Sequence, residues 1–272
     1  MGAVFRKHPT QAQPVPSMSV RTHHPAPGFD PRGLSVDCLL WCRADAGVNE
    51  NGSTVAGWED MSGNGNDFAQ ATAIEQPALE VGGLGGRPEL TFDGVNDTLS
   101  GPSFYGMLSD PADWTFFSVV GSGWSWGSNV NAYYGRGVVG APVGGGSWFY
   151  ASVTSEAGPG FGVGYWDNPS SAHRISYEDS AAEGESVIFS CLSDSSNLTT
   201  SVNGSAGSTV AGGGPGLGST ATTLQMGKGN ANLDHWDGSI SEMLIFDGAM
   251  SEDEITSVER YLSSRYNIRL NG

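Results

Sequence analysis

The acidic side chains are the first residues of this sequence that could do chemistry. Retaining hydrolysis of a glycosidic bond needs two carboxyl groups about 5 to 5.5 Å apart, which on one strand means acids at alternating positions. Some acids instead stand in consecutive runs, Glu252-Asp253-Glu254 and Glu178-Asp179. Glu183 and Glu185 belong to a polar segment. Acids grouped in this way are typical of solvated charge, so we expect no catalytic residues and no enzyme.

Aromatic side chains offer a second kind of chemistry, because the flat faces of sugars stack on exposed aromatic rings. Trp124 and Trp126 in GSGWSWGSN share one side of an extended segment. The pair is either buried or a contact surface, and it is the first candidate for a ligand-binding patch. For most of the other aromatic residues between 133 and 166, burial in a core is the favoured interpretation.

The three cysteines are Cys38, Cys42 and Cys191, an odd number, so at least one thiol stays free. In an unbroken strand Cys38 and Cys42 share a face roughly 13 Å apart, too far for a disulfide. Either could meet Cys191, but three small buried side chains are the favoured interpretation. No Cys or His pair has the spacing of zinc ligands.

Composition excludes several classes of protein. The chain has 272 residues, of which 38% are hydrophobic, enough for one large β-sandwich with a core. A net charge of −17 argues against nucleic acid as a partner. No apolar run approaches the roughly 20 residues that cross a bilayer, so we expect no membrane partner. The first residues lack the apolar stretch of a signal peptide, and Arg6 stands where a myristoylation signal has Ser or Thr.

Residues 1–33 differ from the rest of the chain. Six prolines fix φ and remove amide donors there, which predicts an extended arm ahead of a single domain at residues 34–272. Basic residues in this arm are opposed by Asp30 alone. The arm residues expected to contact a partner are Phe5, Arg6, Lys7, Arg21 and Arg32.

Short β-rich runs separated by turns dominate the sequence after Val36. No long amphipathic helix separates them, which excludes a doubly wound α/β sheet and predicts an all-β, antiparallel sandwich of the jelly-roll type. Residues 204–220 have almost no apolar mass and are expected to be an exposed connector. The expected strands lie in 36–43, 89–94, 114–121, 148–153, 174–177, 186–193, 198–204, 222–227 and 240–247.

One helix is expected near the C-terminus, where Ser251 and Glu254 have the spacing of a capping box. Ile255, Val258 and Leu262 would form its apolar stripe.

The run ISEMLIFD predicts a central strand that is buried on both sides. Alternation places Ile240, Glu242, Leu244 and Phe246 on one face, and Met243 and Ile245 on the other. Glu242 then needs a partner.

Four segments together resemble a known family. They are LLWCRADAGV, GWEDMSGNGNDFAQ, QPALEVGGLGGRPELTFDGVNDTL and GSISEMLIFDGAMSEDEITSVERYLSSRY. In this order they resemble laminin-G-like members of the concanavalin A-like lectin/glucanase superfamily, of the type found in phage and bacterial surface proteins. The resemblance is close over residues 36–100 and 236–268, whereas the middle agrees only in its rhythm of strands. It implies a concanavalin A-like β-sandwich.

The same residues have plain structural roles. Trp58 would fill the core, and Phe92 and Leu99 would point inward from paired strands. Gly63 and Gly65 would supply turn conformations. The polar side chains expected to bond neighbouring backbone are Asp60, Asn64, Asn66 and Asp67.

The resemblance also bears on chemistry, because the superfamily contains glucanases and calcium-dependent binders. The E-x-D-x-x-E pattern of its glucanases is absent from this sequence. Calcium prefers carboxylate and amide oxygens, so Ca²⁺ is the one cofactor considered, although Asp and Asn are also the default turn residues and that interpretation leads. The candidate metal ligands are Asp93, Asn96 and Asp97, with Asp234 and Asp237 as a second group.

Two functions remain open. The first is a non-enzymatic structural protein of a virus particle, a capsid decoration (cement) or spike protein on the virion surface, bound through its arm to the major capsid protein or another virion protein. Such an arm could span about 100 Å in polyproline II form. The second is a lectin-like adhesin for host or cell-surface carbohydrate, calcium-dependent or not, placed extracellularly or at the cell surface by a non-Sec route. We rank the first above the second, and expect a homo-oligomer by analogy with other decoration proteins.

Overall fold

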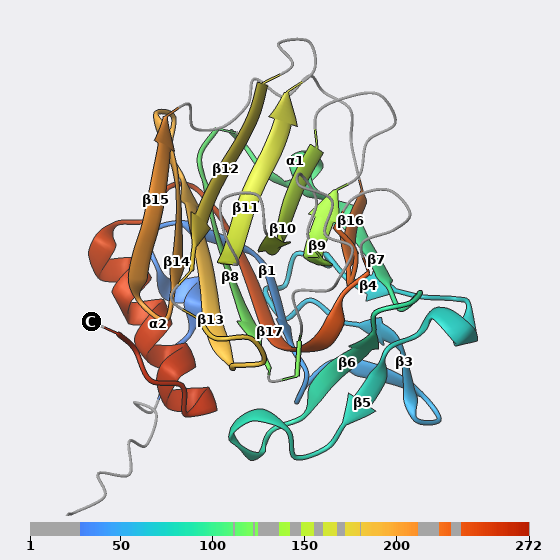
Figure 1. Ribbon diagram of the computed structural model, residues 1–272. Coiled ribbons are helices and arrows are strands. Elements are labelled where there is room, and N and C mark those ends of the chain that lie inside the picture. The colour runs from blue at the N-terminus through green and yellow to red at the C-terminus, as the bar shows by residue number, and fades with distance from the viewer. Residues whose placement is uncertain are drawn as a thin grey trace, which may run out of the picture.

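The computed structural model describes residues 28–110, 112–121, 123–124, 136–141, 148–154, 160–167, 172–179, 181–211, 223–229 and 235–271. Within these ranges the chain forms an antiparallel β-sandwich with one long helix, α2 (Glu252–Tyr266), along one side (Figure 1). This is the fold class expected from the sequence. None of the helices in these ranges is long and apolar enough to cross a membrane.

The sheet that lies against α2 is called here the helix-side sheet, and all its neighbouring strands are antiparallel. Its strands, from one edge to the other, are β15 (Ser205–Ala211), β14 (Asn197–Val202), β13 (Val187–Ser193), β8 (Trp114–Val120), β17 (Asp237–Asp247) and β1 (Asp37–Arg43).

The second layer, called the opposite sheet, covers the other face of the helix-side sheet. Its strand order is β12 (Ala172–Glu178), β11 (Gly160–Asp167), β10 (Trp148–Thr154), β9 (Arg136–Ala141), β16 (Thr223–Met226), β7 (Leu99–Ser103), β4 (Phe68–Ala69), β3 (Thr54–Trp58) and β2 (Val48–Asn51).

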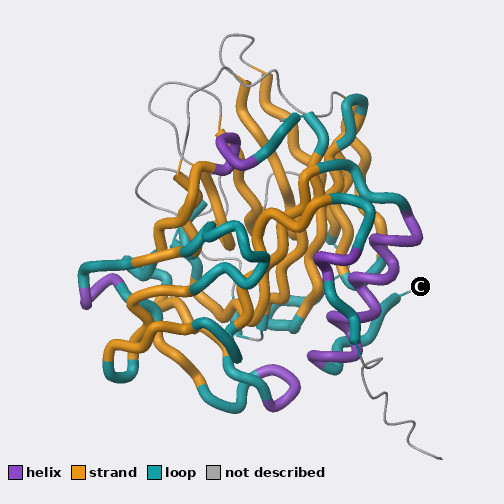
Figure 2. The backbone as a smooth tube through the Cα atoms, turned by 180° about the vertical axis from the view of Figure 1, so that it is seen from behind, coloured by secondary structure: helices purple, strands orange, loops and turns teal. Residues whose placement is uncertain are grey.

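Two further strands join the layers, because β5 (Ala78–Glu80) pairs with β3 and β6 (Glu89–Asp93) pairs with both β5 and β17. The loop between β5 and β6 reaches the C-terminal end of α2, where Arg87 Nε donates to the Arg265 carbonyl at 3.0 Å (Figures 1 and 2). The short helical elements are η1 (Pro31–Gly33), η2 (Ala73–Glu75), η3 (Leu84–Gly86) and α1 (Phe104–Met107).

The main core lies between the two sheets. Phe116, Phe189 and Ile245 point into it from the helix-side sheet. Trp58 fills it as expected and is fully buried, as are Phe92 and Leu99. The strands of Phe92 and Leu99 are not paired with each other as predicted, because β6 pairs with β5 and β17 whereas β7 pairs with β4 and β16. At about 1.5–3 kcal/mol for each large apolar side chain buried, this layer dominates the stability of the fold.

A second apolar cluster lies on the outer face of the helix-side sheet, beneath α2. Val258 and Leu262 of the predicted stripe are buried there, and Ile255 packs against the cluster. The capping box between Ser251 and Glu254 is present. β17 lies between β1 and β8 and is buried on both faces, which confirms that it is a central strand.

Two β-bulges correct the simple alternation expected in the sequence. In β1 the register shifts between Cys38 and Leu40, and in β17 between Ile240 and Glu242. Cys38 consequently faces α2 while Cys42 faces the main core, so the two do not share a face. Ile240 likewise lies in the main core, opposite to the Leu244 side on which we placed it.

The bulges form because each extra residue finds partners for its carbonyl group. The Leu39 carbonyl accepts hydrogen bonds from Ser62 Oγ at 3.1 Å and from Asn66 Nδ2 at 2.7 Å. Asp60 accepts the Trp41 amide at 2.9 Å and holds the loop itself. The polar side chains of GWEDMSGNGND therefore bond neighbouring backbone as predicted, and hold the bulge in β1.

Glu242 has the partners that its burial requires. Its Oε1 accepts hydrogen bonds from Trp41 Nε1 at 2.7 Å and Tyr261 OH at 2.9 Å. Its Oε2 accepts one from Tyr266 OH at 2.8 Å and lies 3.2 Å from Arg265 Nε. Arg265 also forms an ion pair with Asp45. The carboxylate of Glu242 therefore joins β17 to Trp41 of β1 and to the tyrosines of α2.

Part of the expected connector is a strand. Residues 205–211 of the expected connector form the edge strand β15, paired with β14.

All three cysteines are free and buried, as the favoured interpretation predicted.

The last residues of the expected arm lie on the folded domain. Phe29 stacks on Tyr261 with the ring centroids 4.5 Å apart, and Pro31 is buried. Ser35 donates from its amide and its hydroxyl to Glu254 of α2, at 2.9 and 2.6 Å. Residues 28–33, assigned to the arm from the sequence, therefore pack on their own domain.

Candidate functional site

The first group of candidate calcium ligands holds a turn together. Asp93 Oδ1 accepts the amide of Val95 at 2.8 Å and that of Asn96 at 3.2 Å. Asp97 Oδ2 accepts the Asp93 amide at 2.9 Å, and Asn96 donates its side-chain amide to the Ile74 carbonyl at 2.9 Å. Asp93 Oδ1 and Asp97 Oδ2 therefore accept hydrogen bonds from backbone amides. This is the structural role in a turn that we expected as the alternative to calcium binding.

Burial raises the pKa of Asp97 to about 6. The backbone amides that Asp93 accepts lower its pKa. Among the described residues no three His, Cys, Asp or Glu side chains are gathered as metal ligands. Asp237 of the second group forms an ion pair with Arg136, whereas Asp234 lies outside the described residues.

The aromatic pair is divided by the structure. Trp124 is 1% exposed, and its Nε1 donates to the Glu185 carbonyl at 2.7 Å. Its ring packs edge-on against Phe161. Trp124 is therefore a buried core residue, the first of the two alternatives expected for it, and not part of a contact surface. Trp126 lies outside the described residues.

Of the arm residues expected to contact a partner, only Arg32 is described. Its guanidinium pairs with Asp30 at 2.6 Å, and its charge lies 5.8 Å from the centre of the Trp41 ring. Arg32 is thus engaged within its own chain. Phe5, Arg6, Lys7 and Arg21 lie outside the described residues.

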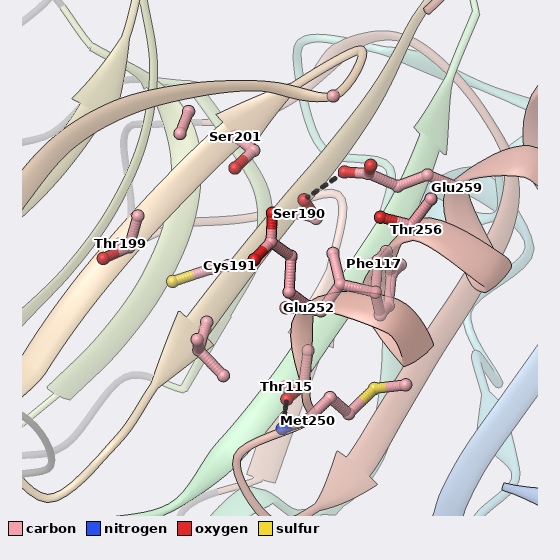
Figure 3. Close-up of a pocket in the computed structure, with 14 residues that line it drawn as sticks. Thr115, Phe117, Ser190, Cys191, Thr199, Ser201, Met250, Glu252, Thr256 and Glu259 are labelled. Carbon is pink, nitrogen blue, oxygen red and sulfur yellow. Dashed lines mark hydrogen bonds between the residues drawn. The ribbon is translucent and has the colours of Figure 1, made fainter. Parts of the chain in front are cut away.

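A cleft of about 310 Å³ opens between α2 and the outer face of the helix-side sheet, and we call it the α2 cleft (Figure 3). Phe117, Met250 and Ile255 contribute apolar walls. Hydroxyl groups come from β8, β13, β14 and α2, and carboxylates from Glu252 and Glu259. The hydroxyl-bearing residues of the lining are Thr115, Ser190, Thr199, Ser201 and Thr256.

Glu259 is the unusual residue of the α2 cleft. It is 6% exposed, and Ser190 Oγ donates to its Oε1 at 3.3 Å (Figure 3). Burial raises its pKa. The sequence analysis missed this residue, although its spacing of four from Ile255 and three from Leu262 places it on the buried side of the helix.

A second and larger cleft, of about 660 Å³, lies where the C-terminal residues pass the β14–β15 turn, and we call it the C-terminal cleft. The backbone amide of Asn271 donates to the Asn203 carbonyl at 2.7 Å, which fixes the tail against this turn. Polar side chains predominate in the lining, with a few apolar ones between them. The lining residues are Leu84, Glu185, Ser186, Asn203, Asn267, Ile268, Arg269, Leu270 and Asn271.

Comparisons with known proteins agree with this architecture. Residues 127–256 match the sequence family described as the concanavalin A-like lectin/glucanases superfamily. This match covers the middle of the chain and part of the last resembling segment, but leaves out residues 36–100. No curated protein sequence matches the chain.

Several solved structures are similar in fold. Domain 4 of AbnA, a GH43 extracellular arabinanase from Geobacillus stearothermophilus solved with arabinotriose, has a TM-score of 0.55 and 12% identity, over 82% of this chain and 98% of that domain. The binding domain of botulinum neurotoxin serotype G has a TM-score of 0.59 and 12% identity, over 84% and 51%. Trypanosoma rangeli sialidase with sialic acid has a TM-score of 0.50 and 14% identity, over 87% and 34%.

At such identities the likeness is one of fold. The chain spans nearly all of the arabinanase domain, but about half of the toxin domain and a third of the sialidase. The fold resembles non-catalytic binding domains, although two of these neighbours come from enzymes. The chain therefore has a β-sandwich similar to those of the concanavalin A-like lectin/glucanase superfamily, and residues 127–256 are the part that matches the sequence family.

Proposed function

We propose that this domain is a non-catalytic module that binds carbohydrate. The observation that carries the proposal is the similarity over 98% of an arabinanase domain that was solved with arabinotriose. The toxin neighbours are also binding domains by description. Fold alone does not specify a ligand, so the proposal also needs a surface with suitable chemistry.

The C-terminal cleft is the surface that we assign to the sugar. Asn267 and Asn271 carry amide groups that both donate and accept hydrogen bonds, as the hydroxyl groups of a neutral sugar require. The side-chain oxygen of Asn203 already accepts the Ile188 amide at 2.8 Å, so Asn203 contributes only its amide donors. Arg269 adds a donor that stays charged and Glu185 adds an acceptor. The apolar side chains of Leu84 and Leu270 lie between them, and a mixture of this kind is typical of small-ligand sites.

The test is a binding measurement with arabinan, xylan and other oligosaccharides of three to six units on a glycan array, followed by calorimetry. We expect Arg269→Ala to weaken binding at least tenfold. Asn267→Gly should do the same while retaining the left-handed conformation that ends α2, where φ is 56°. Arg260→Ala is the matched control. It removes an exposed arginine that lies on α2 and does not line the C-terminal cleft, so this variant should bind normally.

Two results would overturn the proposal. Failure of every glycan to bind would remove the ligand, and equal binding by the wild type and both cleft variants would remove the site. Release of reducing ends from any bound oligosaccharide would contradict the non-catalytic assignment.

A structural role in a virus particle is the second candidate. It rests on the basic, proline-rich composition of residues 1–27, which suits a partner surface of opposite charge. It is also supported by the way Phe29 and Ser35 fasten the start of the domain to α2. Removal of residues 1–27 should leave the fold intact and abolish incorporation into particles, measured by mass spectrometry of purified virions. Normal incorporation of the shortened chain would refute the role of the arm.

A further inference from the structure

The α2 cleft shares no lining residue with the C-terminal cleft, although the two adjoin at the β14–β15 turn, where Gly204 lines the first and Asn203 the second. Its chemistry is different. Its described lining holds two carboxylates and no basic side chain. We propose that this cleft binds a small organic compound with a primary ammonium group, which pairs with Glu259 while the organic body lies against Phe117, Met250 and Ile255. This proposal does not depend on the proposed carbohydrate binding.

The first argument is the poor satisfaction of Glu259. Glu259 as a whole residue is only 6% exposed, and the hydrogen bond from Ser190 is long, at 3.3 Å, and comes from a neutral group. Glu242, buried on the same side of the same sheet, has four donors, one of them a guanidinium. A buried carboxylate without a cation is costly, and an ammonium group would supply both charge and three donors.

The second argument concerns the kind of cation. Calcium binds six to eight oxygen ligands and magnesium keeps several waters, whereas the α2 cleft has apolar walls. No set of three metal-ligating residues occurs among the described residues. An organic body fits these walls, and the hydroxyl groups of Ser201 and Thr256 are available to its polar substituents.

The third argument is electrostatic. The start of a helix attracts anions through its free amide groups, but Glu252, Asp253 and Glu254 already occupy the first turn of α2. Glu252 extends from this turn toward β13, as Figure 3 shows, and adds a second negative charge to the cleft. With a net charge of −17 on the whole chain, the surrounding field also favours a cation.

The size of the cleft limits the ligand. A volume of about 310 Å³ lies at the lower end of the range of ligand pockets, roughly 300–1,000 Å³. One small molecule fits, whereas a chain of several sugar units would not.

The experiment compares two compounds of nearly equal shape by calorimetry at pH 7.5. Cyclohexylamine carries an ammonium group at this pH, and cyclohexanol has a neutral hydroxyl group in its place. We expect cyclohexylamine to bind, and cyclohexanol to bind at least tenfold more weakly. Glu259→Gln should weaken cyclohexylamine binding at least tenfold, and amide shifts in NMR spectra should map to Ser190, Ser201 and Thr256.

Three controls keep the result interpretable. Glu50→Gln removes an exposed carboxylate on β2 and changes the net charge equally, so it should bind within twofold of the wild type. Thr256→Phe narrows the cleft without changing any charge and should block binding. Arg269→Ala alters the C-terminal cleft alone and should leave amine binding intact, which separates this proposal from the proposed function.

The proposal is overturned if cyclohexylamine does not bind, if the two compounds bind equally, or if Glu259→Gln, shown to be folded by its circular dichroism and thermal unfolding, binds like the wild type. Shifts that map elsewhere on the protein would overturn it as well.

Discussion

Glu242 and Glu259 form a natural pair for testing what a buried carboxylate contributes to the stability of this fold. Both lie between the helix-side sheet and α2, and both are nearly inaccessible to solvent, at 0% and 6% exposure. Glu242 accepts from three side chains and pairs with Arg265, whereas Glu259 accepts from Ser190 at 3.3 Å. Substitution of each by glutamine therefore changes the same chemistry in two different surroundings.

We expect Glu242→Gln to lower the free energy of unfolding by about 3–5 kcal/mol, the usual cost of breaking a buried ion pair. The amide of glutamine has to present its NH₂ group to donors on one side of the site, either Trp41 and Tyr261 or Tyr266 and Arg265. A domain has only about 5–15 kcal/mol in total, so this loss is a large fraction. Tyr261→Phe removes one donor and should cost less, about 1.5–3 kcal/mol.

Glu259→Gln should change the stability by less than about 1 kcal/mol in either direction, because glutamine can still accept the hydrogen bond from Ser190 and no cation loses its partner. Urea unfolding followed by far-ultraviolet circular dichroism gives both values, provided that the slope with denaturant stays constant. Equal destabilisation by the two substitutions would refute the reasoning that the four partners of Glu242, and not burial itself, stabilise the fold.

The remaining predictions concern single features of the fold. Hydrogen bonds from Ser35 and Ser251 lower the pKa of Glu254 to about 2, below its value of about 4.3 in an unfolded chain, so the stability it contributes is present above that value and is lost as the pH falls toward 2. Glu254→Gln should therefore reduce the acid dependence of the thermal midpoint between pH 5 and 2, and an unchanged dependence would contradict this. Gly94 has φ of 72°, and a Cβ atom there would lie 2.7 Å from Asp237 Cβ, so Gly94→Ala should cost about 1–3 kcal/mol in urea unfolding. The three buried thiols, of which Cys38 has its pKa raised to about 12 by burial, should react with a thiol reagent only in denaturant, and rapid labelling of the native protein would show that the cysteines are accessible.

Much of the fold could be predicted from the sequence, because the strands with β-branched and aromatic residues carry their own signal. All nine expected runs contain a strand, and the C-terminal helix has its capping box and apolar stripe. The strands that escaped prediction are short or rich in glycine, such as β9 and β11. In β11 the run GFGVG does not alternate large apolar side chains with polar ones, so it lacks the local signal of a strand. Packing within the surrounding sheet holds it in this conformation.

The sites were harder to predict, since burial decides what a functional residue type does. Trp124 has the composition of a sugar platform but is held in the core by its bond to the Glu185 carbonyl. Asp93 and Asp97 have the kind of oxygen that calcium prefers, but Asp93 Oδ1 and Asp97 Oδ2 accept hydrogen bonds from backbone amides of their own turn. The lining of both clefts comes from segments far apart in the chain, a juxtaposition that local patterns do not contain.

The bulge in β17 explains why a charged residue can stand in the most buried strand of the protein. Strict alternation would place Ile240 and Glu242 on one face, yet the extra residue at Ser241 turns Ile240 into the main core and leaves Glu242 toward α2. The carbonyl of Ser241 accepts the Ala44 amide at 2.9 Å, so the irregular backbone is satisfied by the chain that follows β1. The bulge in β1 complements it, since Trp41 then points outward and donates to Glu242. Two irregularities in neighbouring strands thus assemble the Glu242 network that fastens α2 to the sheet, and α2, held in this position, forms one wall of the α2 cleft.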